Sequence, residues 1–451
     1  MARSRKQNVN GITEGVIWQQ IMLFFLPILV GAFLQQLYNT ADAMVVGRFV
    51  GSDALAAIGT TSSFCYLMIG FFMGLGGGGG VVISQFFGAG DKVLMRKAVH
   101  TSLVIALLGG LFLTVFGMLI APVALRLIQV PEEIFADATR YLQITFAGSV
   151  GLTVYNMGAG ILRAVGDSVR PLVYLVASSG LNVGLNLFFV LVLHMGVAGV
   201  ALGTIIAQFG SMGLVLYHLL TTKNDYRVTL GELRLDKSMA ARILRIGVPA
   251  GLQYMMMDFA NVLIQSTINS FGAVAIAGNT VCGRINGFCY LPLNAIGMAA
   301  TTFTGQNVGA ARHDRVFKGA NTALWAAVLS STGIGILAAI FAYPLLGIIT
   351  TDLEVLDMAA YLLRIYGPSY GLYAAIAVFS GVIRGAGYSL PPMVITLVCL
   401  CLFRIAWVIV MTPIWGDMRV VAWIYPVSWT LALIGQFGYY KFGPWRKDLI
   451  K

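Results

Sequence analysis

Polar side chains recur at helical spacing inside segments of this chain that are otherwise apolar. Gln35, Asn39 and Asp42 are spaced so that on a helix they lie on one face. An ionised side chain at membrane depth costs about 2.5–3.5 kcal/mol on insertion scales, so it usually marks a cavity or an ion pathway. The pattern predicts that Asp42 exchanges a cation. The alternative is that Asp42 reaches the outer headgroups beside Arg48 and only anchors a helix end.

A second polar stripe lies in the other half of the chain, and it comprises Tyr254, Asp258, Asn261 and Gln265. Two cations, Arg284 and Arg404, also fall inside apolar segments. Either arginine can form a buried ion pair with Asp258 that only fixes packing, because such pairs often contribute little net stability. Contact with a ligand is the other interpretation, and the sequence leaves both open.

Two asparagines stand one helical turn apart, Asn182 and Asn186, and Thr204 lies in the next apolar segment. Such side chains can offer oxygens to an ion. They can also join neighbouring membrane helices by hydrogen bonds, which are worth about 0.6 kcal/mol on average.

The composition places the chain among integral membrane proteins. Of its 451 residues, 58% are hydrophobic and 10% are charged. The net charge of +11 is better explained by basic loops on one side of a bilayer than by nucleic-acid binding. The five cysteines and four histidines lack metal-ligand spacing, so no metal site or cofactor is expected. A convergent His/Cys/Glu cluster is also absent from the pattern, which argues against an enzyme.

Twelve segments are long and apolar enough to cross a membrane, which takes about 20 residues each. The predicted spans are 17–45, 54–82, 97–121, 134–160, 171–193, 197–219, 240–268, 276–306, 318–342, 355–382, 392–413 and 420–440. The expected fold is therefore an all-α polytopic membrane protein.

The chain repeats itself. The stretch Gly160–Ser168, which contains Arg163, recurs as Gly381–Ser389 with Arg384, and Gln85 and Gly88 recur at the same offset as Gln306 and Gly309. Because each copy has six spans, an even number, both copies enter the membrane from the same side. Because Lys and Arg gather in alternate connections and at both ends, we expect both termini to be cytoplasmic. The predicted parts are an N-lobe (1–220), a cytoplasmic linker (221–239), a C-lobe (240–440) and a tail (441–451).

Glycine and proline mark places of close helix contact or bending. The run Gly74–Gly80 matches a phosphate-loop pattern by letters, but it follows no strand and has no lysine. Tight helix packing is the better interpretation. Pro27 and Pro249 each remove one backbone bond early in the first helix of a copy, so each predicts a bend.

The 6+6 repeat, the segment Tyr38–Gly47 around Asp42, and the paired Arg-x-x-Gly motifs at Arg163 and Arg384 resemble the multidrug and toxic compound extrusion (MATE) family in its prokaryotic branch. The resemblance covers essentially the whole chain. It implies a V-shaped molecule of two six-helix lobes around a central cavity, which exports cationic, often aromatic compounds in exchange for inward Na⁺ or H⁺. It also implies a coupling-ion site formed by Asp42, Asn182, Asn186 and Thr204. Related members often have a second carboxylate where this chain has Asn186, and its loss favours protons, since hard cations prefer charged oxygens.

From these patterns we expect an antiporter with alternating access in a bacterial-type inner membrane, acting as a monomer on small molecules. The expected substrate cavity comprises Gln35, Tyr38, Asn39, Tyr254, Asp258, Asn261, Gln265, Arg284 and Arg404. The main rival is a flippase for a lipid-linked saccharide or a related lipid precursor. A flippase needs a strongly basic cavity for a diphosphate, whereas here two arginines are opposed by two aspartates.

Overall fold

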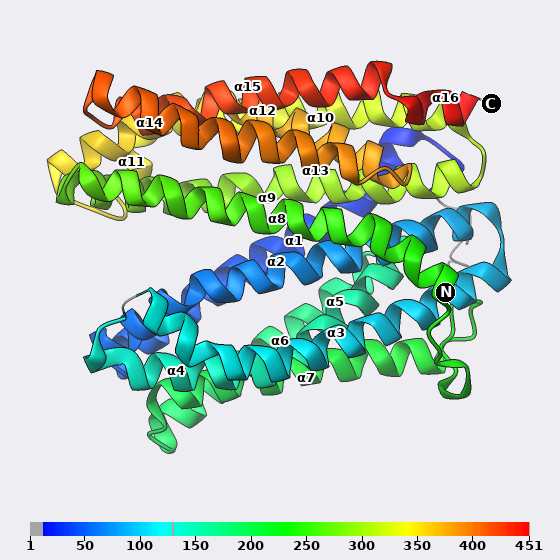
Figure 1. Ribbon diagram of the computed structural model, residues 1–451, viewed down its shortest axis with the longest axis horizontal. Helices are drawn as coiled ribbons and strands as arrows, with labels where there is room; N and C mark the ends of the chain where they lie inside the picture. Colours follow the sequence, from blue (N-terminus) through cyan, green and yellow to red (C-terminus); the bar gives the residue numbers. More distant parts are fainter. Residues whose placement is uncertain (1–11, 129, 451) are drawn as a thin grey trace, which may run out of the picture. The chain divides into compact units, whose positions relative to one another are not determined.

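The computed structural model describes residues 12–128 and 130–450 of the chain, and all its regular elements there are helices (Figure 1). Some side chains within these helices lie outside the described ones, namely those of Tyr38, Asn39, Asp258, Ile450 and residues 41–45, 52–55, 62, 63 and 66. The predicted all-α fold is confirmed for the described part of the chain.

The helices follow the predicted repeat. The first copy contains α1 (Ile17–Phe49), α2 (Ser52–Ala89), α3 (Lys92–Leu127), α4 (Glu132–Ala147), α5 (Ser149–Ala164), α6 (Val169–Leu187) with the π-helical segment η1 (Phe188–Val192), and α7 (Gly196–Thr221). The second contains α8 (Lys237–Ser270), α9 (Ala273–Gly309), α10 (His313–Ile340), α11 (Ala342–Leu346), α12 (Leu353–Gly385), α13 (Leu390–Thr396), the π-helical η3 (Leu397–Leu402), α14 (Phe403–Trp415), α15 (Arg419–Phe442) and α16 (Pro444–Ile450).

Each of the twelve predicted spans lies on helix, but the span 134–160 is divided between α4 and α5, and π-helical segments form part of the spans 171–193 and 392–413. The chain turns at Gly148 between α4 and α5, where a Cβ would overlap the side chain of Ile205 on α7. With 16 residues each, α4 and α5 are individually shorter than the roughly 20 residues a span requires. By length and composition alone, eight stretches of the described residues qualify as spans.

Internal contacts divide the chain into two compact units. Unit 2 is Val30–Gly251, and unit 1 is Leu252–Lys451 together with Met1–Leu29. Both boundaries therefore fall inside a helix, α1 or α8, just after Pro27 and Pro249. The predicted lobes divide the chain by its repeat and differ from the units in the first part of these two helices. The lobe division stays a prediction.

In unit 2 the glycine run of α2 packs on two sides. A Cβ at Gly74 or Gly78 would overlap the backbone of α8 at Gly251 or Gly247. A Cβ at Gly80 would lie 3.4 Å from the Gly160 carbonyl oxygen of α5. Only residues without a Cβ allow backbones this close, so the run is the tight helix contact that its composition predicted.

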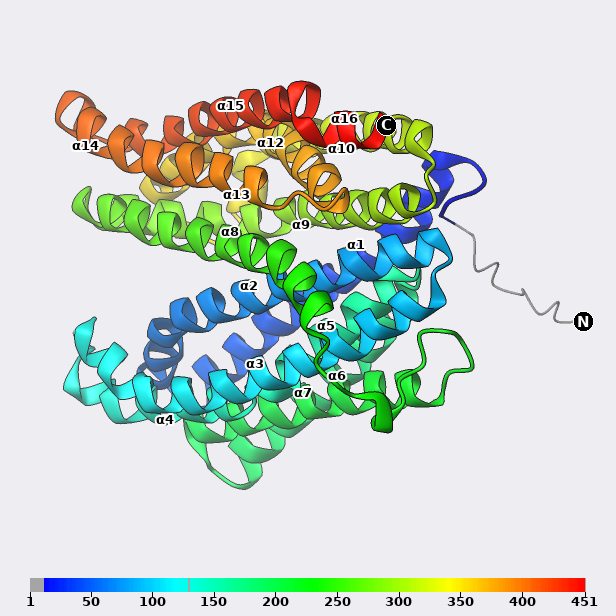
Figure 2. The same cartoon turned by 45° about the vertical axis from the view of Figure 1, so that its right-hand side comes forward.

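Unit 1 is built around α12. Helices α9, α10 and α15 pack on it, as the two views show (Figures 1 and 2). Helix α9 approaches α12 closely because Gly381 faces Gly297; a Cβ at Gly381 would lie 2.5 Å from the Gly297 carbonyl oxygen. Buried aromatic side chains also join α12 to α15: the ring centroids of Tyr370 and Trp429 lie 6.3 Å apart.

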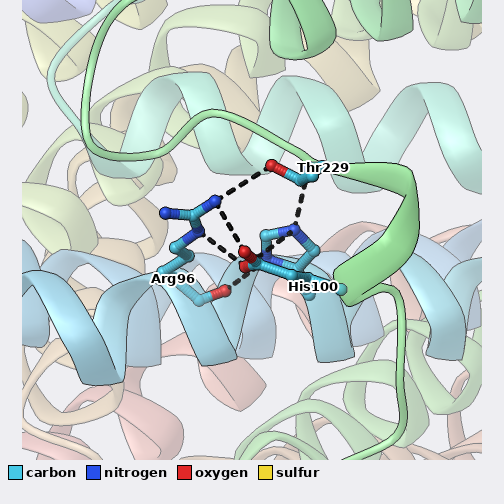
Figure 3. A network of polar contacts seen from close by, with 4 residues as sticks. Arg96, His100 and Thr229 are labelled. Atoms are coloured by element: carbon cyan, nitrogen blue, oxygen red, sulfur yellow. Dashed lines mark hydrogen bonds and ion pairs between the residues drawn. The ribbon is translucent and has the colours of Figure 1, made fainter.

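The linker between α7 and α8 is fixed to α3 by polar contacts (Figure 3). Arg96 contacts Glu232 through Nη2 (2.8 Å) and Nε (2.7 Å), and Nη2 also donates to Thr229 Oγ1 (2.9 Å). The backbone N–H of Thr229 donates to His100 Nε2 (3.0 Å), whose Nδ1 lies 2.7 Å from the Arg96 carbonyl oxygen. The linker is thereby held on unit 2 at several points.

Asp236 ends the linker and opens α8. Its carboxylate accepts hydrogen bonds from the Ser238 hydroxyl (2.6 Å) and the Met239 backbone N–H (2.9 Å). Because both bonds favour the ionised form, they hold the pKa of Asp236 below its ordinary value.

Candidate functional site

Three of the predicted ion-site residues form one hydrogen-bonded cluster in unit 2. Asn186 Nδ2 donates to Asn182 Oδ1 (3.0 Å), and Asn182 Nδ2 donates to Thr204 Oγ1 on α7 (3.2 Å). Thr204 Oγ1 in turn donates to the Val200 carbonyl oxygen (3.0 Å). Asn182 and Asn186 are 1% and 0% exposed. The cluster is thus a chain of neutral dipoles that joins α6 to α7, buried at its two asparagines and half-buried at Thr204. Its amide and hydroxyl oxygens are ligands of the type that hard cations accept.

The close approach of α7 to α6 depends on Gly203. A Cβ at this position would overlap Oδ1 of Asn186. Directly after Asn186 and Leu187 the helix changes to the π-helical segment η1. Such segments are rare and are frequent at functional sites. No pattern in the residue types or their spacing had indicated η1.

The fourth predicted ion-site residue, Asp42, lies on α1, as do three residues of the predicted substrate cavity. The side chains of Asp42, Tyr38 and Asn39 lie outside the described ones, and Gln35 is exposed. The grouping of Asp42 with Asn182, Asn186 and Thr204 therefore stays a prediction.

Unit 1 contains a cavity of about 60 Å³ among α8, α9, α12, α13 and η3. Its polar lining consists of Gln253, Asn294, Thr301, Ser380, Arg384 and Thr396. Tyr254, two methionines and other apolar side chains complete the wall. Tyr254 is the member of the predicted substrate set that lies here.

Arg384 carries the charge of this cavity. Its Nη2 donates to Gln253 Oε1 (3.2 Å) and to Ser380 Oγ (3.2 Å), and its guanidinium carbon lies 6.0 Å from the centre of the Tyr254 ring. Gln253 Nε2 donates to Thr396 Oγ1 (2.9 Å) on α13. The sequence indicated Arg384 only as part of the repeated motif and did not predict it as a site residue. The signal that could have indicated a role for Arg384 is the motif around it, which recurs at Arg163.

The other predicted cavity residues are dispersed. Arg404 is 5% exposed; its Nε donates to Ser428 Oγ (3.0 Å), and it lies over the Tyr425 ring (4.6 Å). Arg284 and Asn261 are exposed, and Gln265 Nε2 donates to Asn269 Oδ1 on its own helix (2.9 Å). The side chain of Asp258 lies outside the described ones, so its pairing with Arg404 or Arg284 stays open.

The helices and the repeat define a polytopic helical membrane protein whose sequence contains two copies of one six-span repeat. Two stretches, residues 27–188 and 249–410, match the model of the MatE family. They begin at Pro27 and at Pro249 and together cover most of the sequence. The chain belongs to the MatE family, as the sequence resemblance predicted.

Curated relatives align with nearly the whole chain. It is 27% identical to the probable multidrug resistance protein YoeA of Bacillus subtilis, over 96% of this chain and 95% of that protein. It is 24% identical to the probable multidrug resistance protein NorM of Thermotoga maritima, over 90% and 88% of the two chains. The multidrug export protein MepA of Staphylococcus aureus is 22% identical over 82% of each.

Solved structures share the fold. A MATE crystal structure in complex with MaL6 superposes with a TM-score of 0.92 at 23% identity, over 99% of each chain. An outward-facing multidrug resistance MATE transporter gives a TM-score of 0.91 at 23% identity, again over 99% of each chain.

Proposed function

We propose that this protein exports organic cations and other toxic compounds from the cell by secondary active antiport. The observation that carries the proposal is the match of both copies to the MatE family, together with relatives named as multidrug export or resistance proteins. Its substrates are then small molecules, and we propose that they are cationic and often aromatic, as the resemblance to the family implies.

The proposed coupling site is Asp42 with Asn182, Asn186 and Thr204. The contacts among the last three support it, because they fix a set of largely buried oxygens next to a π-helical segment. None of these three carries a charge, so Asp42 would supply the negative group that binds H⁺ or Na⁺. Desolvation favours the neutral, protonated form of a carboxyl group, and the absence of a second carboxylate at Asn186 makes H⁺ the better candidate.

In the proposed cycle, ion binding at Asp42 stabilises one of two conformations, and release on the other side stabilises the second. One charge moving through the membrane potential supplies about 2.3 kcal/mol per 100 mV. For a monovalent cationic substrate exchanged one for one, that electrical term cancels, and the ion gradient alone drives export.

The test is dye efflux from proteoliposomes under separately imposed Na⁺ and pH gradients. Asp42→Asn should abolish gradient-driven efflux while the protein keeps its thermal unfolding midpoint. Normal efflux in that variant would remove Asp42 from the mechanism.

A second variant tests whether the coupling ion is H⁺ or Na⁺. Asn186→Asp restores a second carboxylate and should raise the response to Na⁺ relative to the response to H⁺. A variant that responds to both gradients as the wild type does would contradict the proposed role of Asn186.

We also propose that the protein is a monomer of the inner membrane with both termini cytoplasmic. The charge distribution supports this orientation of the termini. Labelling of a single introduced cysteine near either end, from each side of sealed vesicles, tests this orientation.

A further inference from the structure

We infer that the cavity of unit 1 is a binding site for a small anionic group, a carboxylate or a phosphate, held by Arg384. The inference concerns binding and does not depend on the transport proposal. The first observation is the charge of Arg384. Among the described residues no aspartate or glutamate forms an ion pair with it. Its partners Gln253 and Ser380 are neutral.

The guanidinium of Arg384 also has donor capacity left. Its Nε is buried and has no hydrogen-bond partner among the described residues. A buried donor without a partner is costly, and more so on a charged group. Guanidinium groups present N–H pairs in a planar fork that matches carboxylate and phosphate oxygens. An anion is therefore the ligand that balances the charge of Arg384 and matches this fork.

The rest of the cavity suits such a ligand. The described lining contains no aspartate or glutamate, while Asn294, Thr301 and Thr396 add polar groups. Its volume is about 60 Å³, whereas a single water molecule needs about 10–15 Å³ of such space. A headgroup-sized anion fits, and the apolar wall that includes Tyr254 and Met257 would cover a short attached apolar part.

A purely structural role for Arg384 is the alternative. The residue lies in the last turn of α12, where a cation is favoured by the helix dipole by about 0.3–1 kcal/mol. In that case its removal would lower stability but leave the response to anions unchanged, so the two roles can be separated by measurement.

The experiment measures thermal unfolding of the purified, detergent-solubilised full chain with sodium phosphate or sodium benzoate, against sodium chloride at matched ionic strength. In a second arm, native mass spectrometry counts phosphatidylglycerol retained from mixed phosphatidylcholine and phosphatidylglycerol vesicles. Arg384→Met removes the guanidinium group and keeps an unbranched apolar stem. Arg364→Met is the matched control, because Arg364 lies on the same helix over a tyrosine ring (Tyr343, 5.0 Å) but outside the cavity lining.

We expect the anions to raise the unfolding midpoint of the wild type and of Arg364→Met in a saturable way, and Arg384→Met to bind at least about tenfold more weakly. A response to the free anions identifies a soluble ligand, and Arg384-dependent retention of phosphatidylglycerol alone identifies a lipid headgroup. If Arg384→Met fails to fold, Arg384→Lys, which keeps the charge and loses the fork, must show the weakened response. The inference is overturned if the wild type responds in neither arm, or if the Arg384 variants respond as the wild type does.

Discussion

Asn182 lies between two partners: it accepts a hydrogen bond from Asn186 one turn along α6 and donates one to Thr204 on α7. Asn182 thereby links α6 to α7. It is the one member of the cluster whose removal breaks both of these hydrogen bonds.

Asn182→Ala should therefore destabilise the protein by about 1–2 kcal/mol, since hydrogen bonds between membrane helices contribute about 0.6 kcal/mol on average and at most about 1.7. If the cluster serves the coupling ion, gradient-driven efflux should also fall about tenfold, which corresponds to about 1.4 kcal/mol. Thermal unfolding and proteoliposome efflux measure the two effects.

Ser178→Ala is the control for that variant, because Ser178 also lies on α6 and donates to the Leu175 carbonyl of its own helix. Equal losses in the two variants would show that the link to α7 is unimportant.

Gly203→Ala should disrupt the same cluster from the side of α7. The new methyl group would overlap Oδ1 of Asn186, and overpacking of this kind costs about 1–3 kcal/mol. Gly213→Ala on α7 is the matched control, since no described atom lies within 4 Å of a Cβ placed there. Unfolding midpoints should fall for the first variant and hold or rise for the second; the reverse order would contradict the close packing of α6 on α7.

Within the glycine run, single alanines should have opposite effects. Gly78→Ala places a methyl group into the backbone of α8 at Gly247, whereas a Cβ at Gly77 has no described atom within 4 Å. We expect Gly78→Ala to lower expression and the unfolding midpoint. Gly77→Ala should be neutral or stabilising by up to about 1 kcal/mol, because alanine favours helix over glycine. Equal tolerance of both would show that α2 and α8 are not packed this closely.

Release of the linker should be visible by proteolysis. Glu232→Gln removes the charged partner of Arg96, so trypsin should cut at Arg227 or Arg234 faster than in the wild type. The effect on global stability should stay below about 1 kcal/mol, as is usual for exposed ion pairs. Asp417→Asn removes an exposed pair outside the linker, with Arg419 (2.9 Å), and should leave the cleavage rate at these sites nearly unchanged. Identical digestion of all three proteins would show that the Arg96 contacts do not hold the linker.

The hydrogen bonds to Asp236 predict that the stability of the folded protein depends on pH in the acidic range. Because the pKa of Asp236 is lowered in the folded protein, its contribution to stability is present above the unfolded value of about 3.9 and is lost as the pH falls through the folded value. Unfolding midpoints between pH 5 and pH 3 should therefore fall less steeply in Asp236→Asn than in the wild type. Parallel curves would show that Asp236 does not contribute.

Local patterns in the sequence were enough to predict the helices. Runs of apolar residues fix where a membrane span can form, because the bilayer requires backbone hydrogen bonds to close within a segment. The break at Gly148 was missed because apolar residues continue through it. The packing that requires glycine there involves Ile205 on a different helix, which no local pattern shows. The boundaries of the compact units inside α1 and α8 were likewise not readable from hydropathy.

For the candidate sites, too, local spacing predicted some features and tertiary packing decided others. The spacing of Asn182 and Asn186 placed both on one face of α6 in advance, because helical periodicity is a local property. The neutral surroundings of Arg384 and the burial of Arg404 against Tyr425 and Ser428 were decided by tertiary packing, since their partners come from other helices and from distant parts of the chain. The sequence by itself determined the membrane fold, its duplication and its family. Which charges are paired, stacked or left facing a cavity depended on three-dimensional contacts that no one-dimensional pattern encodes.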